Sequence, residues 1–257
     1  MTTVALPRAA ALFERNYWVH RRVWIIIFSG FFEPVFFLFS MGIGLGDFVG
    51  KVPGPEGRLV SDAAFIAPAL LATSAMNGAI YDATSVFWKM KYAKLYDAVL
   101  ATPVGPNDVA VGETAWALFR GLLYGGAFLA TTAALGLVES AWAVLSLPSA
   151  LLIGFAFAGA GVAGSTFMRS WQDFEFLNVV QLPMFLFSTT FFPITVYPGS
   201  VQWIVRCTPL YHGIQLQRAL TLGGADWWQL GDVAYLVIMG LIGVAIAGRR
   251  VHELLLT

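Results

Sequence analysis

The stretch that decides the fold is residues 140–168, which read SAWAVLSLPSALLIGFAFAGAGVAGSTFM. None of these 29 residues carries a charge, and the apolar positions run continuously instead of alternating with polar ones. A transmembrane helix needs about 20 consecutive apolar residues, whereas strands of a membrane barrel alternate apolar and polar positions. The stretch therefore predicts a helix that crosses a lipid bilayer.

Five further segments have the same character, at residues 23–46, 63–81, 109–138, 176–192 and 230–248. The composition agrees, because 58% of the chain is hydrophobic and only 12% is charged, with a mean hydropathy of +0.72. A soluble domain carries about 25% charged residues, so lipid must act as solvent for much of this chain. We expect an all-α integral membrane protein with six transmembrane helices, forming a single domain over residues 1–257.

The fifth apolar run continues past one membrane width, since residues 176–205 hold no charge after Glu175 and before Arg206. Proline breaks or kinks helices, and three prolines punctuate the segment that follows: Pro193, Pro198 and Pro209. We interpret residues 193–222 as a short extracellular helical hairpin that re-enters the membrane edge. The alternative is an apolar outer loop. The re-entrant form is favoured because irregular backbone at membrane depth must be sheltered by protein.

Lysine and arginine are distributed unevenly between the two sides. With the N-terminus in the cytoplasm, ten of the fifteen fall in inside segments and four in outside segments, while Arg120 lies within a span. By the positive-inside rule both termini are cytoplasmic, and we expect a multi-pass protein of the cell (plasma or inner) membrane. The formal net charge is zero, which gives no electrostatic basis for a nucleic-acid partner.

Two cytoplasmic segments have amphipathic patterns. In the connection at residues 82–108, a stripe of Trp88, Tyr92, Leu95 and Val99 lies opposite Lys94 and Asp97, which predicts one helix that ends at Thr102 and Pro103. The pattern alone leaves open a plain interfacial helix or a contact for a partner. The N-terminal stretch predicts a second amphipathic helix, with an apolar face made of Ala9, Leu12, Phe13 and Tyr17.

Three charges within the predicted spans are candidate functional groups, because a charge in hydrocarbon is costly: Glu33, Glu113 and Arg120. Glu113 and Arg120 are two helical turns apart and share one face. The favoured interpretation places Glu113 near the cytoplasmic interface and pairs Arg120 with Glu33 or a backbone carbonyl. The alternative is a proton-coupled carrier or channel in which one of the three charges titrates during transport.

Motifs for enzymatic chemistry are incomplete. The GxGD that ends at Asp47 and the YD that ends at Asp82 match intramembrane aspartyl proteases, but these aspartates are expected on opposite membrane faces, about 30 Å apart. The chain has no GxxxxGK[ST] phosphate loop and no GxSxG elbow. Its single cysteine, Cys207, excludes an intrachain disulfide and a multi-cysteine metal site. We expect no catalytic residue and no metal site.

Two stretches resemble the ABC-2 type transporter permeases. The first is YAKLYDAVLATP at residues 92–103, followed by VAVGE at 109–113, and the second runs from FP at 192–193 to TPLYHGI at 208–214. The resemblance follows the segment order along nearly the whole chain. It is nearest to the branch that contains lipo-oligosaccharide nodulation-factor exporters and daunorubicin-type drug exporters. Asp97 stands where members of that branch usually carry glutamate.

The resemblance implies a non-catalytic exporter permease that moves an amphipathic substrate outward, such as a lipid-linked saccharide, a lipid or a hydrophobic drug. This chain would bind no cofactor itself. ATP and Mg²⁺ would bind to a pair of ATP-binding cassette subunits, and a second permease, identical or paralogous, would complete a dimer within membrane lipid. The segment that couples to the ATPase would contain Trp88, Lys91, Lys94, Leu95, Asp97, Leu100, Thr102 and Pro103. The re-entrant element would contain Pro193, Pro198, Pro209, Tyr211 and His212.

Overall fold

The computed structural model describes residues 6–21, 32–44, 46–91, 94–168 and 170–256. Helix α1 spans Leu6–Arg21, and residues 32–37 form a helix that runs into the π-helical segment η1, Leu38–Ile43. The later helices are α3 Gly46–Val49, α4 Asp62–Lys91, α5 Leu95–Leu100, α6 Pro106–Ala134, α7 Ser146–Ser165, α8 Phe174–Phe187, α9 Gly199–Cys207, α10 Pro209–Leu222 and α11 Gln229–Leu256. Short 3₁₀ turns lie at Pro55–Gly57, Ala141–Leu145, Trp171–Asp173 and Ile194–Val196.

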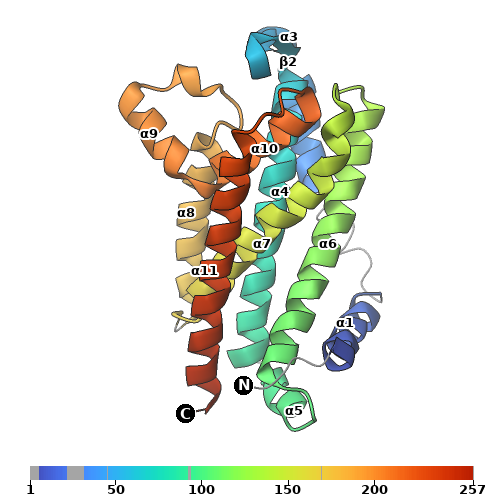
Figure 1. Cartoon of the computed structure of the whole chain (residues 1–257), viewed down its shortest axis with the longest axis vertical. Helices are drawn as coiled ribbons and strands as arrows, with labels where there is room; N and C mark the ends of the chain where they lie inside the picture. Colours follow the sequence, from blue (N-terminus) through green and yellow to red (C-terminus); the bar gives the residue numbers. More distant parts are fainter. Residues whose placement is uncertain (1–5, 22–31, 45, 92–93, 169, 257) are drawn as a thin grey trace.

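The long helices run between two ends of an elongated molecule (Figure 1). Helices α1 and α5 and the end of α11 gather at one end, while α3, β2 and α9 lie at the other. The opposite end also carries a small antiparallel hairpin of β1 (Lys51–Pro53) and β2 (Leu59–Ser61). The predicted coupling segment and the C-terminal helix therefore share one end of the fold.

Within the described ranges, three helices are long and apolar enough to cross a bilayer: Asp62–Ala83, Ala141–Ser165 and Gln229–Ala247. They correspond to the second, fourth and sixth predicted spans. The third predicted span falls on α6 and the fifth on α8, which has 14 residues with Pro183 inside it. The first predicted span is described only from residue 32 onward, because residues 22–31 and 45 lie outside the described residues.

Helix α7 lies at the centre of the bundle, where it packs against α11, α4, α6 and α10. Its approach to α11 depends on glycines, since a Cβ built on Gly243 would lie 2.3 Å from the carbonyl carbon of Gly159. A Cβ on Gly159 would lie 2.7 Å from the oxygen of Gly240. Small residues at such crossings let helix backbones come close in a membrane, where packing rather than hydrophobic burial drives association.

The structure corrects the prediction of one amphipathic helix at the cytoplasmic connection. Helix α4 continues without a break to Lys91, so Trp88 belongs to the end of this long helix. Helix α5 begins only at Leu95 and has six residues. Lys94 has a φ of +45°, a left-handed conformation that does not continue an α-helix. This backbone turn separates the two helices, which a pattern of apolar residues does not reveal.

Candidate functional site

Helix α5 forms the tip of the connection between α4 and α6. Lys94, Ala98 and Ala101 are exposed, and so are Thr102 and Pro103, which follow the helix. The Thr102 hydroxyl donates to the carbonyl of Val99 at 2.6 Å and closes the end of α5. The side chains of Lys91, Asp97 and Leu100, also predicted for the coupling segment, lie outside the described residues. The tip therefore presents a small exposed surface at the end of the bundle.

The inner side of this tip packs against the N-terminal helix. Leu12 of α1 and Val109 of α6 form a buried cluster, against which the half-buried Val99 and Val104 pack. Helix α6 begins at Pro106, and the Asp108 carboxylate caps it by accepting from the Gly105 amide at 3.0 Å. The α1 helix was predicted from its apolar stripe, and the structure confirms that Ala9 and Leu12 are buried.

Arg120, a charge of the third predicted span, pairs with Asp82. Its guanidinium contacts the Asp82 carboxylate across α6 and α4, and the two side chains are 7% and 15% exposed. The predicted partner, Glu33 or a backbone carbonyl, was wrong. Glu33 is exposed on the helix at residues 32–37, whereas Arg120 is buried between helices. Two opposite charges buried together between helices cost less than two isolated buried charges.

A second charge pair lies nearer the α5 tip. The Lys89 ammonium is 2.7 Å from the Glu113 carboxylate, and the two side chains are 17% and 8% exposed. The same carboxylate oxygen accepts from the amide of Asn16 in α1 at 3.2 Å. Phe13 of α1 also meets the ring of Trp116 edge-on, with centroids 5.5 Å apart. Helices α1, α4 and α6 are thus joined by polar and aromatic contacts on one side of the tip.

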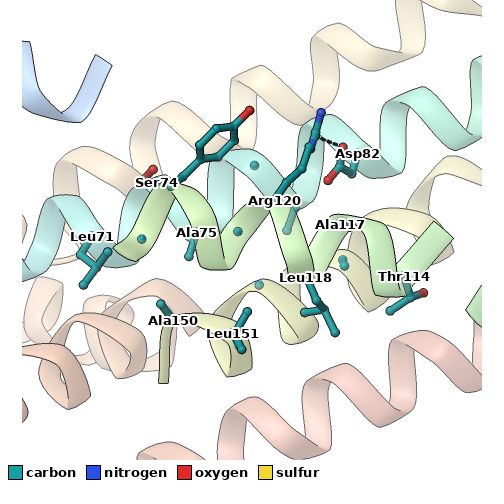
Figure 2. A pocket seen from close by; sticks show the side chains of 17 residues that line it. Leu71, Ser74, Ala75, Asp82, Thr114, Ala117, Leu118, Arg120, Ala150 and Leu151 are labelled. Atoms are coloured by element: carbon teal, nitrogen blue, oxygen red, sulfur yellow. Dashed lines mark hydrogen bonds and ion pairs between the residues drawn. The ribbon is translucent and has the colours of Figure 1, made fainter. Parts of the chain in front are cut away.

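A small cavity of about 30 Å³ lies beside the first charge pair, between α4, α6 and α7. Figure 2 shows Arg120 and Asp82 together at one end of it, with Leu71 towards the other end. Most of its walls are small side chains, with a few polar ones, including Ser74, Thr114 and Tyr124. Arg120 Nε is buried and has no hydrogen-bond partner among the described residues, so this cavity is where water could reach it.

The predicted re-entrant element is helical, as expected. Pro193 precedes a 3₁₀ turn, Pro198 precedes α9, and Pro209 occupies the first turn of α10, where its missing N–H is harmless. His212 Nδ1 is 2.6 Å from the Asp232 carboxylate of α11. The His212 ring also stacks on Tyr235, with centroids 4.1 Å apart. The neighbouring Tyr211 meets His212 edge-on. The His212 contacts with Asp232 and Tyr235 join α10 to α11.

Arg218 of α10 is a buried structural cation that its place in the predicted outer element at residues 193–222 did not reveal. It is 3% exposed and stacks over the ring of Phe65, with its Cζ 3.6 Å from the ring centroid. Its nitrogens donate to the carbonyls of Phe65, Thr189 and Thr190 and to the Thr189 hydroxyl. These acceptors lie 28 to 153 residues away in the chain, so no local sequence pattern marks them.

The mirrored charges of α4 and α6 did leave a signal in the sequence. Asp82 and Lys89 are seven residues apart, as are Glu113 and Arg120, and in both helices the acidic residue comes first. Two antiparallel helices with this arrangement can form both pairs at once. The signal was overlooked because the second predicted span ends at residue 81, which leaves Asp82 and Lys89 in the connection at residues 82–108.

Comparison with known proteins agrees with the resemblance seen in the sequence. The family model described as "ABC-2 type transporter" matches residues 8–222. The chain is 32% identical to Nodulation protein J of Rhizobium leguminosarum bv. viciae over 247 residues, which cover 93% of each chain. It is 32% identical to Nodulation protein J of Rhizobium meliloti (strain 1021), covering 83% of this chain and 80% of that protein. The Inner membrane transport permease YadH of Escherichia coli (strain K12) is 24% identical over 234 residues.

Proposed function

Because the chain belongs to the ABC-2 type transporter family, we propose that it is the permease subunit of an ABC exporter, driven by ATP hydrolysis on a separate pair of subunits. In this proposal the chain forms one domain with six spans in the cell membrane and both termini in the cytoplasm. A second permease, identical or paralogous, completes the dimer. The chain itself binds neither ATP nor Mg²⁺ and performs no catalysis.

The observation that carries this proposal is the α5 tip. It lies at the same end as α1 and the end of α11, and it joins two long helices that enter the bundle (Figure 1). Its exposed surface includes Lys94, Ala98 and Thr102. A subunit bound to this surface could push on α4 and α6 together. Differential binding in the ATP-bound and ATP-free states would then shift the permease between two conformations.

The proposed substrate is amphipathic: a lipid-linked saccharide, a lipid or a hydrophobic drug. One face supports this, because the helix at residues 32–37 and α8 expose large apolar side chains beside polar ones. Phe37 contacts Phe185 edge-on at 5.8 Å, which places the two helices side by side. Gln181 of α8 donates to Asn77 of α4 at 2.5 Å. In the proposed dimer, this face and the second permease enclose the path of the substrate.

The alternative, a proton-coupled carrier that uses Glu33, Glu113 and Arg120, has less support. Glu113 contacts Lys89 and Asn16, and Arg120 contacts Asp82. Charges held in such contacts serve to join helices. A carrier predicts transport that is abolished by Glu33→Gln or Glu113→Gln and is insensitive to vanadate. An exporter permease predicts vanadate-sensitive transport, because the energy comes from the partner's ATP hydrolysis.

The first prediction tests the coupling surface by substitution at the α5 tip. We expect Ala98→Trp to reduce the ATPase subunit recovered with the affinity-tagged permease by at least about tenfold, which corresponds to about 1.4 kcal/mol of binding free energy. Ala225→Trp places the same bulk at an exposed alanine between α10 and α11 and should leave recovery unchanged. The amount of co-purified ATPase, normalised to the permease, is the measurement. Equal recovery from both variants, or none from the unmodified chain, would refute the proposal.

A further inference from the structure

The four charges of α4 and α6 form two ion pairs, one after the other along the helices. We call this arrangement the charge ladder and each ion pair one of its rungs. Asp82 pairs with Arg120, and Lys89 pairs with Glu113. A step of seven residues forward along α4 is thus matched by a step of seven residues backward along α6, as antiparallel helices require. The two rungs are seven residues apart, a rise of about 10 Å along each helix. From the Asp82–Arg120 rung to the Lys89–Glu113 rung, the charge on α4 changes from negative to positive and the charge on α6 changes from positive to negative.

This order of charges opposes sliding of one helix past the other. Displacement by one rung in one direction would bring Asp82 against Glu113, and displacement in the other direction would bring Lys89 against Arg120. Each of these contacts would bring like charges together and would be repulsive. Each would also leave the other two charges without their partners. Breaking a buried pair is costly because a desolvated charge is left behind. The ladder therefore favours one axial position of α4 against α6.

The charges lie where small side chains line the contact between the helices. A cavity of about 30 Å³ lies next to the Asp82–Arg120 rung and is lined largely by small residues such as Ala75, Gly78 and Gly121. Interlocking large side chains normally fix the register of neighbouring helices, and small residues supply fewer of them. Gly121 could accept a Cβ without any atom within 4 Å. The charge pairs therefore add a constraint on register beside this cavity, where Figure 2 shows Arg120 and Asp82 together.

We propose that Asp82, Arg120, Lys89 and Glu113 are positioning residues for energy coupling, which lock α4 and α6 so that the α5 tip moves them as one rigid body. This inference rests on the proposed function, because it assumes that a partner pushes on the tip. Asn16 extends the same body to α1 through Glu113. Without these ion pairs, a force applied to α5 would slide α4 and α6 past each other instead of moving the two helices together.

The test measures distances between spin labels in the full-length permease, with Cys207 replaced by serine and labels on two exposed positions at a time. One pair, Tyr81 and Val111, reports α4 against α6, and the other, Val111 and Val180, reports α6 against α8. In the permease alone, we expect the Tyr81–Val111 distance distribution to be narrow and to broaden at least twofold in the neutral variants Asp82→Asn and Arg120→Gln. The swapped variant reverses all four charges (Asp82→Arg, Lys89→Glu, Glu113→Lys and Arg120→Asp), which keeps both pairs and the alternation of sign along each helix, and it should restore the narrow distribution.

A matched control uses an ion pair outside the ladder. Arg58 and Glu139 lie 4.0 Å apart on the exposed surface, and neither neutralising nor swapping them should change the Tyr81–Val111 distribution. With the ATPase subunit bound, ATP plus vanadate should shift the Val111–Val180 distance but not the Tyr81–Val111 distance. In the neutral variants, ATP should shift the Tyr81–Val111 distance as well.

Three results would overturn the inference: a Tyr81–Val111 distribution that stays narrow in the neutral variants, a swapped variant that remains broad, or an ATP-dependent shift between α4 and α6 in the unmodified protein. The first two need no partner subunit. They remain decisive even if no ATPase co-purifies, which would be the separate failure of the proposed function. If the neutral variants do not fold, the swapped variant decides, because it retains both ion pairs.

Discussion

Replacing Arg218 with methionine is expected to lower the free energy of unfolding by about 3 kcal/mol, because it leaves buried acceptors without a donor. The guanidinium donates hydrogen bonds to the carbonyls of Phe65, Thr189 and Thr190 and to the Thr189 hydroxyl. Methionine fills a similar volume but donates nothing. At this chain length, the midpoint of thermal unfolding in detergent should fall by roughly 6–12 °C.

Arg218 also supports an unusual turn at the end of α8. Thr189 has a φ of +65°, which is strained for a β-branched residue, and Ser188 to Thr190 are fully buried. The guanidinium holds the carbonyls of this turn at the C-terminal end of α8, where a positive charge is favoured by the helix dipole. Its loss should therefore free the connection between α8 and the α9–α10 hairpin first, and proteolysis should cut there at lower temperature.

Two further substitutions separate this effect from a general loss of charge. Arg218→Lys keeps the charge, but a single ammonium cannot reach all the acceptors at Phe65 and in the Thr189–Thr190 turn, so we expect at least half of the destabilisation. Arg58→Met removes an exposed arginine at the same end of the molecule and should change the free energy of unfolding by less than about 0.5 kcal/mol. Equal unfolding temperatures for Arg218→Met and Arg58→Met would contradict the structural role assigned to Arg218.

Gly243→Ala is expected to destabilise the bundle by about 1–3 kcal/mol, because the new methyl group would collide with the backbone of α7. The Cβ would lie 2.3 Å from the Gly159 carbonyl carbon and 2.6 Å from the Ala160 nitrogen. Backbone atoms cannot rotate away, so α7 and α11 must separate. Since α7 also packs against α4, α6 and α10, this separation disturbs the whole bundle. Thermal unfolding and the yield of monodisperse protein in detergent measure the effect.

The control lies on the same helix. Gly231→Ala also replaces a glycine of α11, but no atom lies within 4 Å of the added Cβ. Glycine within a helix costs about 0.5–1 kcal/mol relative to alanine, so this variant should be neutral or slightly stabilised. Opposite signs for the two substitutions are the expected pattern. A Gly243→Ala protein as stable as Gly231→Ala would mean that α7 and α11 do not approach this closely.

The broad fold was predictable because its signals are local. Uncharged stretches predicted the helices, and prolines predicted the breaks before α9 and α10, since both depend on a few neighbouring residues. The family was recognised from short motifs around Asp97 and Tyr211, and the comparisons bear this out. The break at Lys94 was not predicted, because a lysine in a left-handed conformation leaves no mark on an apolar pattern.

The site was less predictable because its contacts join distant segments. Glu113 and Arg120 were identified from the cost of burying charge, yet their partners lie 24 and 38 residues away on α4. Choosing Asp82 over Glu33 as the partner of Arg120 required the relative placement of two helices. The acceptors of Arg218 are harder still to predict, because most of them are backbone carbonyls and every residue has one. The roles proposed for the α5 tip and for the outer hairpin stay predictions.

The length of α4 has a consequence for how a partner would approach this protein. Thirty residues make a helix of about 45 Å, whereas the hydrocarbon core of a bilayer is about 30 Å thick. The apolar part of α4 ends at Ala83, so in the proposed exporter the remaining turns would carry α5 beyond the lipid headgroups. A docking subunit would then meet protein alone, without displacing phospholipids or their counterions. Its affinity should depend little on whether the bilayer is anionic or zwitterionic.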